Sequence, residues 1–223
     1  MCQALGMSAP GFLRISAAAV AMAGALLSAP LGAPAASADQ CADVELVYAR
    51  GTNEPAGLGF LGQTFADSLG AQLPGRSFTV YAVNYPASND YLTSATAGSV
   101  DASAHIENLV VGCPNTKIVL GGYSQGAAVT EMSTSAMPPG VADHVAAVAL
   151  FGRPSSAYSD SLVGGIPLPT ISPRYASKTI DLCIPDDPIC SAGNNMMAHI
   201  SYIPSGMANQ AATFVAERLG PTV

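Results

Sequence analysis

A serine between two glycines gives the strongest chemical signal in this sequence. Ser124 stands in Gly122-Tyr123-Ser124-Gln125-Gly126, which follows an apolar, β-branched run at 117–121 and precedes a helix-like stretch at 127–132. A strand, a tight turn and a helix with serine at the tip form a nucleophile elbow. The glycines leave room for the close approach of strand and helix that this turn requires. The alternative is an ordinary Gly/Ser-rich turn in a chain with 22 glycines.

A serine nucleophile needs a base, and the base needs a carboxylate to orient it. On such an elbow the chain order is Ser, then Asp or Glu, then His. Of the three histidines, only His199 follows a group of carboxylates downstream of Ser124. His105 falls in an expected helix, and His144 opens an expected strand. We therefore expect His199 to be the base, and His105 and His144 to be surface or core-edge residues.

Four carboxylates are candidates for the orienting acid. They are Glu131, Asp181, Asp186 and Asp187. Asp186 and Asp187 lie between Cys183 and Cys190, and a ring this small gains little stability from loop-closure entropy. A rigid support that holds one carboxylate against an imidazole explains the ring better. Solvated aspartates in a turn are the alternative for one of the pair.

The elements that would position these groups alternate between strands and helices. Strands are expected at 44–49, 78–83, 117–121, 144–151 and 179–182. The first helix is expected at 58–73. The second is expected to start at an N-cap, Asp101, and to have an apolar face of Ile106, Leu109, Val110 and Cys113. A third is expected after Ser124 as far as Pro138-Pro139-Gly140, and a last one from about Ser205 to Gly220-Pro221. This order predicts an α/β architecture with a parallel sheet covered by helices.

One long connection, residues 154–178, has no clear periodicity. It is rich in Ser, Gly and Pro, and connections of this length are often functional. We expect it to form the rim of a binding site together with residues 194–197. Its alternative is a plain surface connection. No apolar helical insert of lid size appears between the expected strands, so we expect an open site.

Composition favours a single folded domain and excludes several classes of partner. The chain has 223 residues, of which 49% are hydrophobic and 10% are charged, so that a sizeable core is expected and disorder is not. The formal net charge is −7, and the eight Lys and Arg residues are scattered. Neither nucleic acid nor polybasic membrane attachment is therefore expected. We expect a monomer.

The first 38 residues have the pattern of a secretory signal peptide. Arg14 precedes an apolar segment at 15–27, and Ala36-Ser37-Ala38 is an A-x-A cleavage signature. An uncleaved transmembrane anchor is the alternative, but the apolar run is short for a span of roughly 20 residues. A lipid anchor at Cys41 is not expected, because the preceding residues do not form a lipobox. We expect cleavage after Ala38, one domain at 39–223, and an extracellular location, with retention in the cell wall left open.

The cysteines agree with export. Cys2 leaves with the signal peptide, and the even number that remains implies disulfides. Cys183 and Cys190 are close in sequence and are paired on that ground, which leaves Cys41 to pair with Cys113. Zinc is not expected, because the chain has no Cys-x-x-Cys or close His partner. No other metal and no cofactor is expected.

Together these segments resemble the cutinase family, and most closely the exported cutinase-like carboxylesterases of mycobacteria and related actinobacteria. The matching segments are Gly122-Tyr123-Ser124-Gln125-Gly126, Cys183-Ile184-Pro185-Asp186-Asp187-Pro188-Ile189-Cys190, His199-Ile200-Ser201-Tyr202, Arg50-Gly51-Thr52 and Val83-Asn84-Tyr85-Pro86. The resemblance covers essentially the whole chain after the signal peptide. The five segments taken together are highly specific for this family, whereas no single segment is.

The resemblance implies a three-layer α/β-hydrolase-type sandwich with a central, mostly parallel five-stranded sheet and no lid. It implies Ser124 as nucleophile and His199 as base. It implies Asp187 as acid, because the family acid stands four residues after the first Cys and three before the second. The backbone N–H groups of Thr52 and Gln125 would form the oxyanion hole, and the elbow by itself also points to Gln125.

The expected function is a secreted serine esterase that hydrolyses acyl esters of short to medium chain. The substrate would be a small-molecule, lipid or polyester ester. A phospholipase A or lipase and an acetylxylan esterase are the enzymatic alternatives. The loop from Cys190 to His199, with Asn194-Asn195-Met196-Met197, departs from the plant-cutin enzymes and leaves the substrate open. A binding or antigenic protein on an inactive hydrolase fold is the non-enzymatic alternative, and a complete set of Ser, His and Asp argues against it.

Overall fold

A parallel five-stranded sheet forms the centre of the structure. The computed structural model describes residues 41–168 and 170–221, so the expected signal peptide lies outside the described residues. The strands are β1 (Val44–Ala49), β2 (Phe78–Ala82), β3 (Lys117–Tyr123), β4 (Val145–Phe151) and β5 (Thr179–Leu182). Their order is β2-β1-β3-β4-β5, and every neighbouring pair is parallel. The expected α/β architecture is confirmed.

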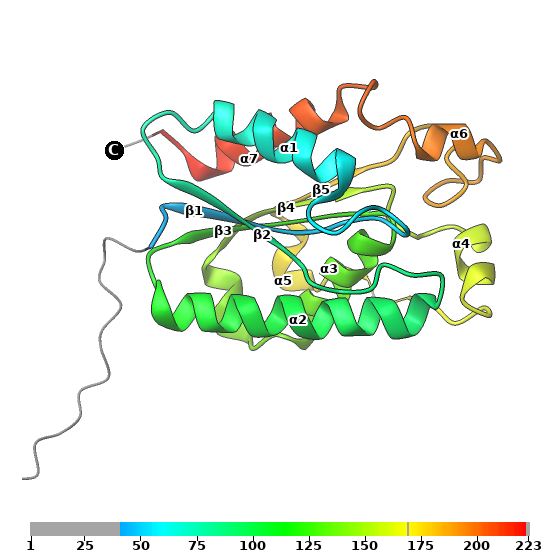
Figure 1. The fold of residues 1–223 in the computed structure, drawn as a ribbon, viewed down its shortest axis with the longest axis horizontal. Coiled ribbons are helices and arrows are strands. Elements are labelled where there is room, and N and C mark those ends of the chain that lie inside the picture. The colour runs from blue at the N-terminus through cyan, green and yellow to red at the C-terminus, as the bar shows by residue number, and fades with distance from the viewer. Residues whose placement is uncertain (1–40, 169, 222–223) are drawn as a thin grey trace, which may run out of the picture. The chain divides into compact units, whose positions relative to one another are not determined.

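Helices cover both faces of the sheet, which makes three layers (Figure 1). They are α1 (Gly59–Ala71), α2 (Tyr91–Gly112), α3 (Gln125–Ala136), α4 (Ala157–Leu162), α5 (Pro173–Ala176), α6 (Met196–His199) and α7 (Met207–Leu219), with a 3-10 turn at Pro139–Asp143. Helices α1 and α7 lie on one face, and α2, α3 and α5 lie on the other (Figure 1). Helices α4 and α6 lie beyond the carboxyl ends of the strands.

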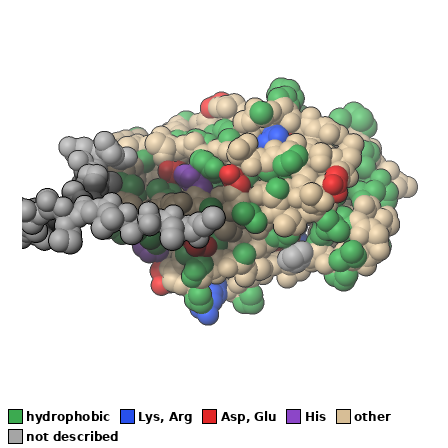
Figure 2. All heavy atoms as spheres, turned by 60° about the horizontal axis from the view of Figure 1, so that its bottom comes forward, with side chains coloured by type: hydrophobic (Ala, Val, Ile, Leu, Met, Phe, Trp, Pro, Cys, Tyr) green, Lys and Arg blue, Asp and Glu red, His purple; other side chains and the backbone are tan. Residues whose placement is uncertain are grey.

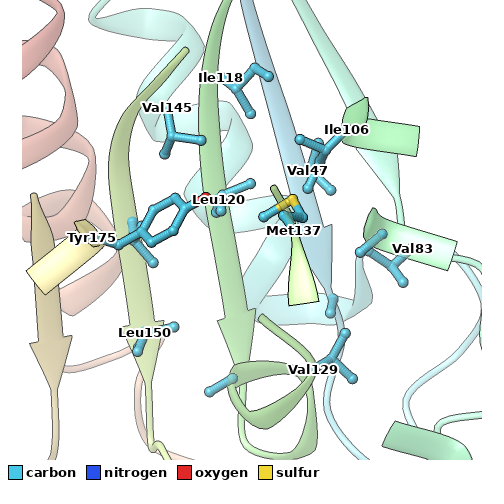
Figure 3. Close-up of a cluster of buried hydrophobic side chains, with 14 of the residues drawn as sticks. Val47, Val83, Ile106, Ile118, Leu120, Val129, Met137, Val145, Leu150 and Tyr175 are labelled. Carbon is cyan, nitrogen blue, oxygen red and sulfur yellow. The ribbon is translucent and has the colours of Figure 1, made fainter. Parts of the chain in front are cut away.

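The central strands β1, β3 and β4 are mostly apolar because both of their faces are buried. Toward α2 and α3, the sheet contributes Val47, Ile118, Leu120, Val145 and Leu150, which Figure 3 shows in one cluster with residues of the covering helices. Toward α1 and α7, it contributes Leu46, Tyr48, Val119, Ala149 and Phe151. Successive side chains of a strand point to opposite faces, so β1, β3 and β4 contribute to both clusters.

Helix α2 begins eleven residues earlier than expected, with Asp90 as its N-cap, and the expected N-cap at Asp101 is wrong. Asp101 lies inside the helix, where its Oδ2 accepts hydrogen bonds from the Asn84 N–H (2.8 Å) and the Tyr81 hydroxyl (2.9 Å). The early part of α2 packs closely on α3. A Cβ added to Gly98 would lie 2.9 Å from Val129 Cγ2. This contact between helices, not local propensity, makes the segment helical.

The two disulfides have the expected pairing. Cys41 is bonded to Cys113, which joins the amino end of β1 to the end of α2. Cys183 is bonded to Cys190 in the loop after β5. The connection at 154–178, for which no helical period was expected, contains the short helices α4 and α5. Among the described helices, none has both the length and the apolar character to span a membrane.

Candidate active site

Ser124 occupies the sharp turn between β3 and α3. Its φ of 55° and ψ of −119° lie outside the regions that L-residues favour, which is the strained backbone expected of an elbow. A Cβ on Gly122 would overlap the Gly126 carbonyl, and a Cβ on Gly126 would overlap the Ala49 carbonyl oxygen. The two glycines therefore allow α3 to start directly against β3 and β1.

A chain of hydrogen bonds links Ser124, His199 and Asp187. Ser124 Oγ lies 2.9 Å from His199 Nε2, and His199 Nδ1 lies 2.8 Å from Asp187 Oδ2. The serine comes from the β3–α3 turn, the histidine from the end of α6, and the aspartate from the loop after β5. Asp187 is fully buried and His199 is nearly so. The structure thus brings together the three side chains expected from the sequence.

The buried carboxylate of Asp187 has further donors. Its Oδ2 also accepts a hydrogen bond from the Tyr202 hydroxyl (2.7 Å), and its Oδ1 accepts one from the Ile189 N–H (2.8 Å). Burial favours the neutral acid, but the hydrogen bonds from His199, Tyr202 and Ile189 outweigh it and hold the pKa of Asp187 below its usual value. The group is therefore ionised at neutral pH. Sequence reasoning gave Tyr202 no role, although its segment was part of the resemblance.

The other candidate carboxylates do not bond to His199. Asp186 is exposed, and its carbonyl accepts a hydrogen bond from the Asn195 N–H (3.0 Å), which ties the disulfide loop to the start of α6. Asp181 pairs with Arg153 at 2.7 Å. Glu131 is buried in α3, 3.6 Å from Arg153 Nη1. Of the four candidates, only Asp187 faces the imidazole.

Thr52 lies in a turn after β1 that side chains hold in place. The Arg50 guanidinium donates to the carbonyls of Glu54 (3.0 Å) and Tyr85 (2.8 Å). The Glu54 carboxylate accepts from the N–H groups of Gly51 (2.6 Å) and Phe60 (2.8 Å). The bonds of Arg50 and Gly51 are buried or half-buried, so the position of Thr52 is fixed by the fold.

Gln125 is the first residue of α3, and its side chain is fully buried. Its amide accepts a hydrogen bond from Ser94 Oγ (2.8 Å) and donates one to the Ser88 carbonyl (2.9 Å). Within the described residues, the backbone N–H groups of Thr52 and Gln125 donate to no protein acceptor. Both donors are thus free for another partner, as expected of the first N–H groups of a helix and of an open turn.

A cavity of about 450 Å³ opens above these groups. It is lined by Thr52, Asn89, Tyr91, Ser124, Pro154, Ser159, Leu162, Ile189, Met196 and His199. Both segments expected at the rim contribute, namely 154–178 and 194–197. Asn89 and Tyr91, at the start of α2, were not expected, because no motif marks them. Figure 2 shows hydrophobic side chains gathered at the end of the fold where α4 lies.

The remaining histidines lie elsewhere. The ring of His105 stacks on Tyr81 with a centroid distance of 3.5 Å and contacts Glu45. His144 Nδ1 lies 3.1 Å from the Pro114 carbonyl oxygen. In the described part of the chain, no group of three or more His, Cys, Asp or Glu side chains is arranged to hold a metal ion.

Comparison with known proteins extends these observations. The family model described as Cutinase matches residues 40–219. Carboxylesterase Culp1 of Mycobacterium tuberculosis is 62% identical over 96% of this chain and 98% of its own. Phospholipase Culp4 of the same organism is 49% identical over 91% and 89%. A Trichoderma reesei cutinase in complex with a phosphonate inhibitor has a TM-score of 0.67 and 35% identity, over 81% of this chain and 78% of that one. The chain therefore belongs to the cutinase family and is a carboxylic ester hydrolase.

Proposed function

We propose that this protein is an exported serine esterase that hydrolyses short- to medium-chain acyl esters through an acyl-enzyme. One observation carries the proposal. His199 Nδ1 donates to the Asp187 carboxylate, and His199 Nε2 accepts from the Ser124 hydroxyl, so the chain of hydrogen bonds starts at a serine on a strained elbow in an open cavity. Such an arrangement suits nucleophilic attack on a carbonyl carbon.

In the proposed reaction, Ser124 Oγ attacks the ester carbonyl while His199 Nε2 takes its proton. The buried carboxylate of Asp187 holds the imidazole in orientation and stabilises the imidazolium. The free N–H groups of Thr52 and Gln125 stabilise the oxyanion. His199 then protonates the leaving alcohol. Water, activated by the same histidine, releases the acid from Ser124.

The size and lining of the cavity suit an acyl chain of limited length. Its lining is mostly apolar, with Leu162, Ile189 and Met196 around Ser124. It opens to solvent through the rim, and the part of the chain that the structure describes places no large helical insert above it. A series of nitrophenyl esters of increasing acyl length, measured beside a phospholipid and a solid polyester, tests the preference. A phospholipid turned over faster than every short ester would favour a phospholipase instead.

Export is proposed on the cysteines and on the N-terminal pattern. Two disulfides in a small domain are typical of proteins that fold in an oxidising compartment. The expected cleavage after Ala38 is tested by N-terminal sequencing of the protein from culture filtrate. A first residue other than Asp39, or recovery only from the cytosolic fraction of lysed cells, would count against this pathway.

The catalytic role is tested by Ser124→Ala. Loss of the nucleophile should lower kcat on the order of 10⁶-fold and abolish labelling by a fluorophosphonate probe. Ser135→Ala, at an exposed serine on the same helix, is the matched control and should keep both. A folded Ser124→Ala protein with more than about a tenth of the activity would exclude this role.

A further inference from the structure

A second cavity begins at His199, the proposed general base, and leads away from Ser124. Its volume is about 340 Å³, and it shares Thr52 and His199, but not Ser124, with the cavity described above. Its large lining side chains are Phe60, Leu61, Tyr123, Ile200, Tyr202 and Ile203. It therefore reaches His199 from the side of α1.

The polar side chains of Tyr123, Tyr202 and Glu54 in this lining are already engaged. The hydroxyl of Tyr123 donates to the His199 carbonyl (2.6 Å), and that of Tyr202 donates to Asp187 (2.7 Å). The Glu54 carboxylate accepts two backbone N–H groups. What the cavity offers to a ligand is consequently its rings and aliphatic side chains, which suits an apolar chain.

The apolar surface continues beyond this cavity. A further hollow of about 520 Å³ shares Phe60 and Ile203 and runs along residues 55–64 at the amino end of α1. Phe60, Ile200 and Ile203 are 68%, 61% and 42% exposed, respectively. Contiguous exposed side chains of this size commonly mark binding surfaces. We call this path, from His199 past Ile203 to Phe60, the α1 groove.

Ester chemistry decides which part of a substrate this groove can take. The carbonyl carbon bonds to Ser124 Oγ, so the acyl chain lies in the cavity that contains Ser124. The alcohol oxygen must receive its proton from His199 Nε2 as the C–O bond breaks. The alcohol portion therefore departs past His199, where the α1 groove begins.

We propose that the α1 groove binds the alcohol portion of the substrate, and that the preferred esters carry an extended apolar alcohol. This inference rests on the proposed serine esterase function. It assigns the two arms of the ester to different surfaces, the acyl chain to Leu162 and Met196 and the alcohol chain to Ile203 and Phe60.

The test varies the two arms separately. Hexanoate esters of ethanol, butanol and octanol should show kcat/KM rising with alcohol length, by up to about fourfold per buried methylene. Phe60→Ser and Ile203→Ser should lower the octyl-to-ethyl ratio about tenfold, since they remove apolar contact area. Both variants should leave the ratio of ethyl octanoate to ethyl butyrate as in the wild type. Leu162→Ser should instead lower the ratio of ethyl octanoate to ethyl butyrate and leave the octyl-to-ethyl ratio of the hexanoate esters as in the wild type.

Val111→Ser is the matched control. Val111 is an apolar side chain on α2 that is 84% exposed and lines neither cavity, so both ratios should stay unchanged. A flat response to alcohol length, or variants of the α1 groove that change the acyl ratio instead, would overturn the inference while the esterase function stands. Hydrolysis that persists in Ser124→Ala would instead overturn the function itself.

Discussion

Glu131 is a buried carboxyl group whose ionisation should oppose folding. Its side chain is almost fully buried in α3, and its Oε2 has no hydrogen-bond partner among residues 41–168 and 170–221. Burial raises the pKa of Glu131 to about 8, although Arg153 and the Ile171 N–H favour the charged form. The folded protein thus holds a proton that the unfolded chain releases at a much lower pH.

The size of the effect follows from the difference in pKa. Between the ordinary value of 4.5 and about 8, the folded state binds more protons than the unfolded state, so stability falls as pH rises. At 1.36 kcal/mol per pKa unit, the full penalty above pH 8 is roughly 3 to 5 kcal/mol. Glu131→Gln removes it, and Arg153 keeps its partner Asp181.

Urea unfolding at pH 5 and pH 9 measures the penalty. The variant should match the wild type closely at pH 5 and be more stable by roughly 3 kcal/mol or more at pH 9. Any fixed cost of burying the amide is the same at both pH values, so the difference between them isolates the ionisation. Glu107→Gln, at an exposed site on α2, should show no such difference. An equal effect at both pH values would mean that Arg153 keeps Glu131 charged, and would refute this reasoning.

Asp187→Asn should lower kcat by about 10⁴-fold, because asparagine favours the wrong imidazole tautomer, whereas Asp186→Asn should have little effect; equal losses would contradict the assignment of the acid. Tyr202→Phe should destabilise the protein at pH 7 by about 1.5 to 3 kcal/mol, since it removes a donor to a buried charge. That cost should vanish as pH falls through the lowered pKa of Asp187, and a pH-independent cost in urea unfolding would indicate a packing role only. Gly126→Ala should cost about 3 kcal/mol or more, or prevent folding, because its Cβ overlaps the Ala49 carbonyl; an active variant of normal stability would refute the elbow geometry. Hydrolysis of a short-chain triglyceride should show no jump in rate at its solubility limit, and a sharp rise there would favour a lidded lipase.

The sequence predicted the sheet because burial dominates its strands. Each expected strand was found within two residues of its bounds, since an apolar run enclosed on both faces has few alternatives. The three side chains that meet at the elbow were also expected, because each lies in a short segment with its own chemical pattern.

The parts that were missed depend on contacts between distant segments. Residues 91–100 are rich in Ser, Thr, Ala and Gly and have weak helical propensity. Their small side chains allow this part of α2 to pack closely on α3, which the local sequence does not reveal. Asp101 resembled an N-cap, yet it binds Asn84 and Tyr81 from another element. Tyr91 reaches the cavity only because this helix starts early. Local pattern carries none of this information.

The strand order has a consequence for how the chain reaches its native state. Val44 of β1 pairs with Phe78 of β2 on one side and with Lys117 of β3 on the other. Strand β1 is therefore paired on both of its edges only after nearly half of the described chain, as far as the end of β3, is available. Pairings of such long range slow folding and prolong the time during which apolar strand edges are unprotected. We expect refolding on the scale of seconds or longer, and aggregation in competition with it.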